Sequence, residues 1–312
     1  MTIKKAIDDY ILHCKIEKNL SLKTIEFYLI DLKQFYQFTT DQKIKYIHEV
    51  DRNILRSFFI SKQEFKPRTI KRKMACLKAM FTYMEFSDLI DVNPFRKMQL
   101  KYNTPKYLPT VMNQTEVQSI LEQAYTDRRD VQNQNSFAYQ VKTRDICILE
   151  MLFATGIRVS ELCNLKKSQI DLSTGIIQVS GKGNKERIVQ IVDSETKSLL
   201  KEYYQLFAAH INETGFFFVN RLYKKISDQS VRFMIRKYTQ MAGIRKNITP
   251  HTFRHTFATL LLEADVDIKY IQQFLGHSSI VTTQIYTHVN KEKQLQILNS
   301  KHPRLNFKME RG

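Results

Sequence analysis

The chain has 312 residues, of which 43% are hydrophobic, so it is long and apolar enough for about two globular domains and is not a disordered polypeptide. Lysine and arginine number 49 against 31 acidic residues, which gives a formal net charge of +18. This excess predicts a polyanionic partner, with nucleic acid ahead of an anionic membrane, and no apolar run approaches the ~20 residues that a membrane span needs.

The cysteines and the N-terminus indicate the cell compartment. The first ten residues mix lysines with aspartates and contain no apolar h-region, so they do not form a signal peptide. The four cysteines are far apart and form no C-x-x-C pair. We expect reduced core residues of a cytoplasmic protein, and neither a disulfide framework nor a zinc site. These cysteines are Cys14, Cys76, Cys147 and Cys163.

Helices dominate the first part of the chain. Helical periodicity predicts four of them, over residues 4–19, 22–39, 52–63 and 67–86. Ser21 is a plausible N-cap of the second helix. The fourth helix carries cations beside an apolar stripe, so one face can pack while another meets DNA phosphates. Charge alone leaves a solvated basic helix as the alternative. The cations are Arg68, Lys71, Arg72, Lys73 and Lys78.

A linker is predicted after this helical unit. Residues 98–109 contain two prolines and no convincing periodicity, which favours extended backbone. Such a linker would let two basic domains close around a duplex. Beyond it we expect a helix from Gln114 to about Tyr125, then a long exposed polar loop over residues 126–142, then an apolar helix over residues 145–154.

The first charged motif follows that helix, in Thr155-Gly156-Ile157-Arg158-Val159-Ser160-Glu161-Leu162. Gly156 breaks the helix and another helix starts after it. Arg158 and Glu161 are three residues apart, so the carboxylate can orient the guanidinium. An ordinary intrahelical ion pair is the alternative interpretation.

A β-hairpin is predicted next. Residues 176–180 and 187–192 have the pattern of strands, and the glycine-rich turn 181–186 presents Lys182 at the tip. A P-loop is excluded because G-x-x-x-x-G-K-[ST] is absent and no helix follows. Lys182 suits a backbone contact or a proton donor, although a lone lysine in a turn is more often simply a surface residue.

Two further helices are expected at about 194–209 and 228–242. The second charged motif follows them, at the start of another helix. Thr249 is the expected N-cap and Pro250 suits the first helical position. His251 and Arg254 then lie on one face at a helix N-terminus, which favours an anion. The motif indicates a phosphate site, with a solvated polar face as the alternative.

The last part of the chain adds a histidine and a tyrosine. A helix over residues 268–275 is stopped by Gly276, and His277 follows directly. Ser278 or Ser279 can cap a short helix that ends in Gln284-Ile285-Tyr286-Thr287-His288. A final amphipathic helix is expected over residues 291–300.

These groups together suggest phosphoryl transfer. Two arginines can hold the non-bridging phosphate oxygens, and a tyrosine hydroxyl can attack phosphorus once its proton is withdrawn. Histidine can act as a base, and lysine can protonate a leaving alkoxide. No acidic cluster has metal-ligand spacing, so we expect catalysis without a metal.

Five motifs in this order resemble those of the tyrosine recombinases of the phage integrase family, and most closely the bacterial Xer-type and integrase members. They are Arg158 in Thr155-Gly156-Ile157-Arg158-Val159-Ser160-Glu161-Leu162, Lys182 in Gly181-Lys182-Gly183, His251-x-x-Arg254, Leu275-Gly276-His277, and Tyr286 in Thr283-Gln284-Ile285-Tyr286-Thr287-His288.

The resemblance implies a mainly α fold with a small β-hairpin sheet. An N-terminal helical core-DNA-binding domain would span residues 1–97, the linker residues 98–109, and an α+β catalytic domain residues 110–312. The two domains would form a C-shaped clamp around DNA.

The resemblance also implies the chemistry. Tyr286 would attack a DNA phosphate, giving a 3′-phosphotyrosyl link and a free 5′-hydroxyl. Lys182 would be the general acid for the 5′ oxygen, and His251 would assist proton transfer from the tyrosine. No cofactor, metal or ATP is required.

Phosphate binding and assembly follow from the same resemblance. Arg158 and Arg254 would clamp the phosphate, His277 would hydrogen-bond it, and Glu161 would support Arg158. Family members act as tetramers on two duplexes, alone or with a second recombinase, and exchange strands through a Holliday junction. Each passes a C-terminal segment, here residues 291–312, to a neighbour.

Two features depart from the family pattern or vary within it. The polar stretch 126–142 is longer than expected before the first arginine motif, which suggests an insertion for specificity or for a partner. His277 stands where some members carry tryptophan, in agreement with the Xer-like branch.

The expected activity is site-specific recombination in a bacterial cytoplasm, at the nucleoid, for dimer resolution or for integration and excision of a mobile element. Three rivals remain. They are type IB topoisomerase-like strand passage, a non-catalytic DNA-binding regulator, and a metal-dependent nuclease that EDTA would inhibit.

Overall fold

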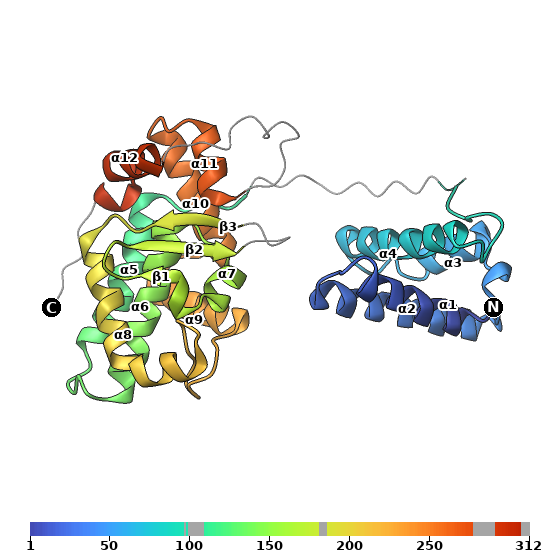
Figure 1. The fold of residues 1–312 in the computed structure, drawn as a ribbon, viewed down its shortest axis with the longest axis horizontal. Helices are drawn as coiled ribbons and strands as arrows, with labels where there is room; N and C mark the ends of the chain where they lie inside the picture. The colour runs from blue at the N-terminus through green and yellow to red at the C-terminus, as the bar shows by residue number, and fades with distance from the viewer. Residues whose placement is uncertain (97, 99–108, 181–185, 277–290, 307–312) are drawn as a thin grey trace. The chain divides into compact units, whose positions relative to one another are not determined.

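The chain divides into two compact units, Met1–Tyr107 and Leu108–Gly312, each with its own hydrophobic core (Figure 1). The computed structural model describes residues 1–96, 98, 109–180, 186–276 and 291–306. Most of the expected linker 98–109 lies outside these ranges, so its conformation stays a prediction.

The first unit is a bundle of four helices, as the sequence predicted. Large aromatic side chains fill its centre, among them Tyr10, Phe35, Phe58 and Phe81, each at most 1% exposed. A short 3₁₀ turn precedes the third helix. The elements are α1 (Ile3–Ile16), α2 (Leu22–Asp41), η1 (Ile47–Glu49), α3 (Arg52–Ile60) and α4 (Pro67–Phe86).

Local capping explains where these helices start. The Ser21 hydroxyl accepts a hydrogen bond from the Thr24 N–H at 3.3 Å, which confirms Ser21 as the N-cap of α2. Asp51 caps α3 in the same way, and Pro67 occupies the first turn of α4, where its missing N–H costs nothing.

The second unit is built around one buried helix, α6 (Phe137–Thr155). Every residue from Thr143 to Thr155 in it is buried. It packs against α5 (Gln114–Arg129), α8 (Ser194–Thr214) and α10 (Pro250–Glu263). This all-round burial explains the near-continuous apolar sequence of its second half.

A three-stranded antiparallel sheet lies in this unit, in the order β1-β2-β3 (Figure 1). The two predicted strands are confirmed as β2 (Ile176–Ser180) and β3 (Glu186–Gln190), and Ile177 pairs with Val189. β1 (Ile170–Asp171) was not predicted, because two residues are too short to show alternation.

The polar stretch 126–142 is not the long loop that we expected. Helix α5 continues to Arg129 and α6 begins at Phe137, so a short connection joins two longer helices. The polar side chains are paired across the fold: Arg128 and the Tyr139 hydroxyl both donate to the carboxylate of Glu202 on α8. Sequence composition did not reveal these partners, because Glu202 is more than sixty residues away.

Two late helices of the chain pack against the C-terminal half of α10. Phe257 and Leu261 of α10, Phe274 of α11 (Ile268–Leu275) and Leu298 of α12 (Lys291–Lys301) form a small second core in this unit. The other elements of the unit are α7 (Val159–Asn164), η2 (Lys167–Gln169), α9 (Asp228–Met241) and η4 (Pro303–Asn306).

The turn η4 is fixed to α6 of the same chain. Arg304 is 2% exposed and donates to Glu150 at 3.1 and 3.2 Å and to Glu195 at 3.3 Å. The His302 ring is within hydrogen-bond distance of the Ala154 carbonyl. Exchange of residues 291–312 with a neighbour stays a prediction.

All four cysteines are free and buried, so the expectation that they are core residues is confirmed. Among the described residues, no helix combines the length and apolar character required to cross a bilayer.

Candidate active site

The site is centred on a sharp turn between α6 and α7. Gly156 ends α6 with a left-handed φ of 57°, which glycine adopts without steric cost. Two residues later, Arg158 is the N-cap of α7. The turn therefore directs Arg158 away from the core at the start of a helix, as the charged motif predicted.

Arg158 and Glu161 form the predicted pair. The backbone N–H of Arg158 donates to one carboxylate oxygen of Glu161 at 2.9 Å, and its Nη1 donates to the other at 2.8 Å. Nη2 donates to the carbonyl of Gly276 at 3.1 Å. The side chain is 32% exposed, so its guanidinium is held in place and still open to a ligand.

Arg254 of α10 lies in the same cluster but is buried, at 5% exposure. Its Nη1 donates to the Gly156 carbonyl at 2.7 Å, and its Nη2 donates to the Leu275 carbonyl. Burial, and then the positive charges of Arg158 and Arg187, lower the pKa of Arg254 to about 9, which leaves it cationic at neutral pH. Adding an anion would relieve this repulsion.

Arg187 of β3 is a site residue that the sequence analysis missed. Its two terminal nitrogens donate to the two Glu161 oxygens at 2.9 and 2.7 Å, and its Nε donates to the Phe274 carbonyl at 3.1 Å. A signal was present. Arg187 and the buried Val189 share one face of a strand, so a cation at position 187 turns toward the interior and requires a partner.

Glu161 remains an anion within this cluster. Burial acts to raise its pKa, but the hydrogen bonds and charge of Arg187, followed by the hydrogen bonds of Arg158, hold that pKa below its usual value. Arg158 and Arg187 both bond to this carboxylate, and Arg254 lies in the same cluster, so the four side chains carry a net charge of about +2 at neutral pH. This excess of positive charge favours an anionic ligand.

His251 begins α10 near this cluster, and the Thr249 hydroxyl caps the helix as predicted, accepting from the Thr252 N–H at 3.3 Å. Burial lowers the pKa of His251, and Arg232 of α9 and His255 lower it further. The ring is on the surface and neutral at pH 7, so it can accept a proton.

Three predicted site residues lie outside the described residues: Lys182, His277 and Tyr286. Their roles stay predictions.

The predicted DNA-binding helix α4 requires one correction. Arg68, Lys71 and Lys78 are exposed at helical spacing and can form one basic face. Lys73 is only 1% exposed, and its ammonium donates to Asp31 at 2.8 Å and to Gln34 at 2.6 Å. Lys73 therefore forms a buried ion pair between α2 and α4, and its ammonium is not exposed to contact DNA phosphates.

Arg72 also contacts this buried aspartate, although a third of its side chain stays exposed. Its guanidinium donates to Asp31 and lies 5.0 Å from the centre of the Phe27 ring. The main contacts of Arg72 therefore link α4 to α2, and only the exposed edge of its guanidinium could reach DNA.

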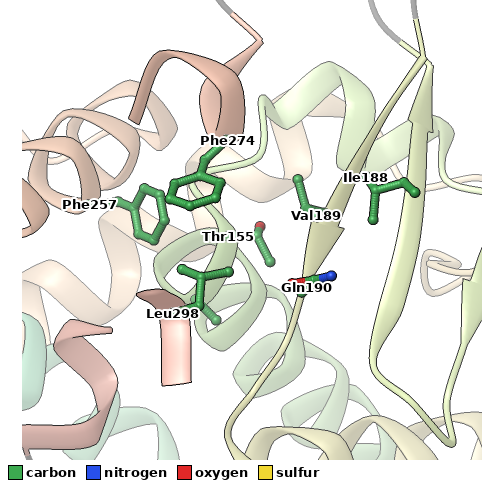
Figure 2. A pocket seen from close by; sticks show the side chains of 8 residues that line it. Thr155, Ile188, Val189, Gln190, Phe257, Phe274 and Leu298 are labelled. Atoms are coloured by element: carbon green, nitrogen blue, oxygen red, sulfur yellow. The ribbon is translucent and has the colours of Figure 1, made fainter. Parts of the chain in front are cut away.

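A cavity beside the arginine cluster is too small to be the substrate site. Its volume is about 10 Å³, roughly the space for one water molecule. Figure 2 shows the rings of Phe257 and Phe274 on one side and Val189 and Gln190 of β3 on the other. The part of the arginine cluster that is open to solvent is instead Arg158, whose side chain is 32% exposed.

No group of three His, Cys, Asp or Glu side chains within the described ranges is placed to hold a metal ion. Metal-free chemistry nevertheless stays a prediction to be tested with a chelator.

Known proteins resemble the chain over almost its full length. Residues 110–293 match the phage integrase family, and residues 7–85 match the phage integrase N-terminal SAM-like domain. A tyrosine recombinase of Agathobacter rectalis is 45% identical over 303 residues, 96% of this chain and 97% of the relative.

Two further comparisons agree. Tyrosine recombinase XerC of Thermodesulfovibrio yellowstonii is 36% identical over 310 residues, 95% of this chain and 96% of the relative. The crystal structure of XerH site-specific recombinase bound to difH substrate, a pre-cleavage complex, has a TM-score of 0.67 at 25% identity. That alignment covers 90% of this chain and 81% of XerH.

Proposed function

The chain belongs to the phage integrase family of tyrosine recombinases, and we propose that it cuts and rejoins DNA at a specific site with Tyr286 as nucleophile. The observation that carries this proposal is the convergence of Arg158 and Arg254 on adjacent carbonyls, those of Gly276 and Leu275. Two guanidiniums so close together suit two oxygens of one phosphate.

The charge of the cluster fits the reaction. A phosphodiester carries one negative charge, and the transition state for its displacement carries close to two. Arg158, Arg187 and Arg254 together exceed Glu161 by about two positive charges. The site therefore binds the transition state more tightly than the ground state, which is the requirement for catalysis.

The proposed step is a balanced exchange of esters. The Tyr286 oxygen attacks phosphorus, and the bond from phosphorus to the 5′ oxygen breaks. His251, neutral at pH 7, takes the phenolic proton, and Lys182 gives a proton to the leaving 5′ oxygen. The 3′-phosphotyrosine keeps the bond energy, so a 5′-hydroxyl of another strand can reseal the break without ATP. His277 would add a hydrogen bond to the phosphate.

Strand exchange sets the assembly. Moving both strands of two duplexes requires four cuts, and hence four active sites, so we propose a tetramer of this chain or one shared with a second recombinase. In this proposal both compact units bind the duplex, with Arg68, Lys71 and Lys78 of α4 on the DNA backbone.

The biological task is proposed as either resolution of chromosome or plasmid dimers or insertion and excision of a mobile element. Because its proposed substrate is chromosomal or plasmid DNA, we propose that the protein acts at the bacterial nucleoid, in the cytoplasm. Sequencing the DNA bound to the protein in cells would separate the two tasks, because one predicts a single chromosomal site and the other predicts the ends of an element.

A covalent trap tests the nucleophile. The probe is a nicked duplex carrying the sequence that the wild-type chain selects from a random-sequence library. We expect wild type to form a covalent adduct, and Tyr286→Phe to bind the probe with unchanged Kd and form none. Tyr270→Phe, on the described helix α11, is the matched control and should form adducts. An adduct with Tyr286→Phe would assign the nucleophile to another residue.

Two controls separate the rival activities. Adduct formation should persist in EDTA, whereas a metal-dependent nuclease would stop. A supercoiled plasmid with two selected sites should yield recombinant circles, and a plasmid with one site should not. Relaxation of both plasmids without recombinants would favour a topoisomerase.

A further inference from the structure

Arg187 connects three elements that are distant in sequence. It extends from β3 to the Glu161 carboxylate of α7 through two hydrogen bonds and to the Phe274 carbonyl of α11 through a third. Its side chain is 12% exposed, so these contacts occupy a largely buried guanidinium. A planar fork with five donors can make all three contacts at once, which lysine cannot.

The first consequence concerns Arg158. Glu161 accepts one hydrogen bond from the side chain of Arg158 and one from its backbone N–H. Both Glu161 oxygens also accept hydrogen bonds from Arg187. The carboxylate therefore has one orientation. Without Arg187 it could rotate about its terminal torsion, and the Arg158 guanidinium would turn with it.

The second consequence concerns Arg254. The last carbonyls of a helix lack partners within the helix and carry its negative dipole end. At the end of α11, three consecutive carbonyls accept from three different arginines: Phe274 from Arg187, Leu275 from Arg254, and Gly276 from Arg158. Arg187 thus fixes the helix end that Arg254 and Arg158 share.

Gly276 shows how closely Arg187 and α11 fit. A Cβ added there would lie 2.8 Å from the Arg187 Cδ, and the backbone has a φ of +61°. Both the backbone and the arginine stem require glycine at the residue just before His277. The position of this helix end is therefore matched to Arg187.

We propose that Arg187 is a positioning residue for strand cleavage: it holds Glu161 and the end of α11 so that Arg158 and Arg254 face the same phosphate. Arg187 does not itself touch the DNA. This inference rests on the proposed function, since it assigns a role in that reaction.

The test compares Arg187→Gln, which removes the charge and the fork, with Arg187→Lys, which keeps only the charge. The matched control is Arg128→Gln, which removes a similarly buried arginine side chain, here paired with the more exposed Glu202, outside the arginine cluster. The probe is the nicked duplex selected by the wild-type chain. The readouts are its Kd and the single-turnover rate of adduct formation with the probe fully bound.

A positioning role predicts a split between binding and chemistry. For Arg187→Gln we expect the Kd to stay within about threefold, while the rate of adduct formation falls on the order of 100-fold because the phosphate is misaligned. Arg187→Lys should recover part of the rate. Arg128→Gln should cleave within about threefold of wild type.

A pH profile supplies a readout that loss of stability would not produce. The charged groups facing Glu161 are Arg158 on α7, Arg187 on β3 and Arg254 on α10. Removing Arg187 should move the acid limb of the cleavage rate to higher pH, because the carboxylate loses the cation that holds its pKa down. The double variant Arg187→Gln/Glu161→Gln lacks this carboxylate and should lose the shift.

The outcomes are distinguishable. If wild type forms no adduct, the proposed function fails. If wild type forms adducts and Arg187→Gln does so at the same rate, or loses no more rate than Arg128→Gln, the positioning role is wrong. Should Arg187→Gln not fold, Arg187→Lys decides: a normal rate with an unshifted pH profile overturns the inference.

Discussion

Gly156 occupies a point where backbone conformation and packing both exclude a side chain. Its φ is +57°, and a Cβ would lie 2.7 Å from Phe257 and 2.9 Å from Leu275. Gly156→Ala should therefore lower the free energy of unfolding by about 2–5 kcal/mol, the sum of left-handed strain and overpacking. Urea unfolding measures this loss.

Gly215→Ala is the matched control for this prediction. Gly215 also ends a helix with a positive φ, of +70°, but nothing lies within 4 Å of the Cβ position. It should lose only the backbone part, about 1–2 kcal/mol. Equal losses at the two glycines would show that crowding against Phe257 and Leu275 contributes nothing.

Single-residue predictions succeeded where the partners are close in sequence. Arg158 and Glu161 are three residues apart, so helical spacing alone indicated their contact. Arg187 was missed because its partners are 26 and 87 residues away. Spacing rules carry no information over such separations.

The misassignment of Lys73 has a different cause. Net charge favoured a phosphate contact, but Lys73 lies on the packed stripe of α4, between the buried Ile70 and Leu77. Asp31 lies next to the buried Leu32 on the packed stripe of α2. A cation and an anion on apolar stripes that pack together predict a buried ion pair. The sequence did not show that these stripes of α2 and α4 contact each other.

At the scale of elements, η4 gives the catalytic unit a pH-dependent stability. Burial lowers the pKa of His302 to about 4, from 6.5 for an ordinary histidine. Below pH 6.5 the unfolded chain binds a proton that the folded chain does not bind until about pH 4. This contribution is therefore complete above pH 6.5 and is lost as the pH falls toward 4.

The expected loss is on the order of 3 kcal/mol across that window, measured as the free energy of urea unfolding. His302→Gln cannot titrate there and keeps both a donor for the Ala154 carbonyl and an acceptor for the Arg304 N–H. Between pH 6.5 and pH 4 the variant should therefore lose less unfolding free energy than wild type, by about the amount given above. Parallel loss of stability in wild type and variant would assign the acid sensitivity to other groups.

Element boundaries were predictable where caps are local. Ser21 and Thr249 mark the starts of α2 and α10 through hydrogen bonds to residues three positions later. The region 126–142 was not predictable, because its polar side chains find partners on α8 and α9, which come much later in the chain. Helix there is stabilised by tertiary contacts that override composition.

At the scale of the whole molecule, the net charge of +18 implies that binding to DNA releases counterions. The logarithm of the binding constant should fall linearly with the logarithm of salt concentration. Arg68→Ala removes one exposed cation from α4 and should reduce the slope by about one, with similar losses of affinity on every sequence. Fluorescence anisotropy with a labelled duplex at several salt concentrations measures the slope.

Lys5→Ala separates a contact from diffuse attraction, because it removes the same charge from an exposed position on α1 of the same unit. If α4 lies against the DNA backbone, Lys5→Ala should leave the slope of the salt dependence nearly unchanged, while Arg68→Ala should lower it. Equal effects would mean that net charge alone attracts DNA and that α4 does not face it. Lys73 is unsuitable for this comparison, because removing its ammonium leaves the buried Asp31 with Arg72 as its remaining cation. The salt slope thus tests the position of α4 on the duplex separately from the chemistry at the arginine cluster.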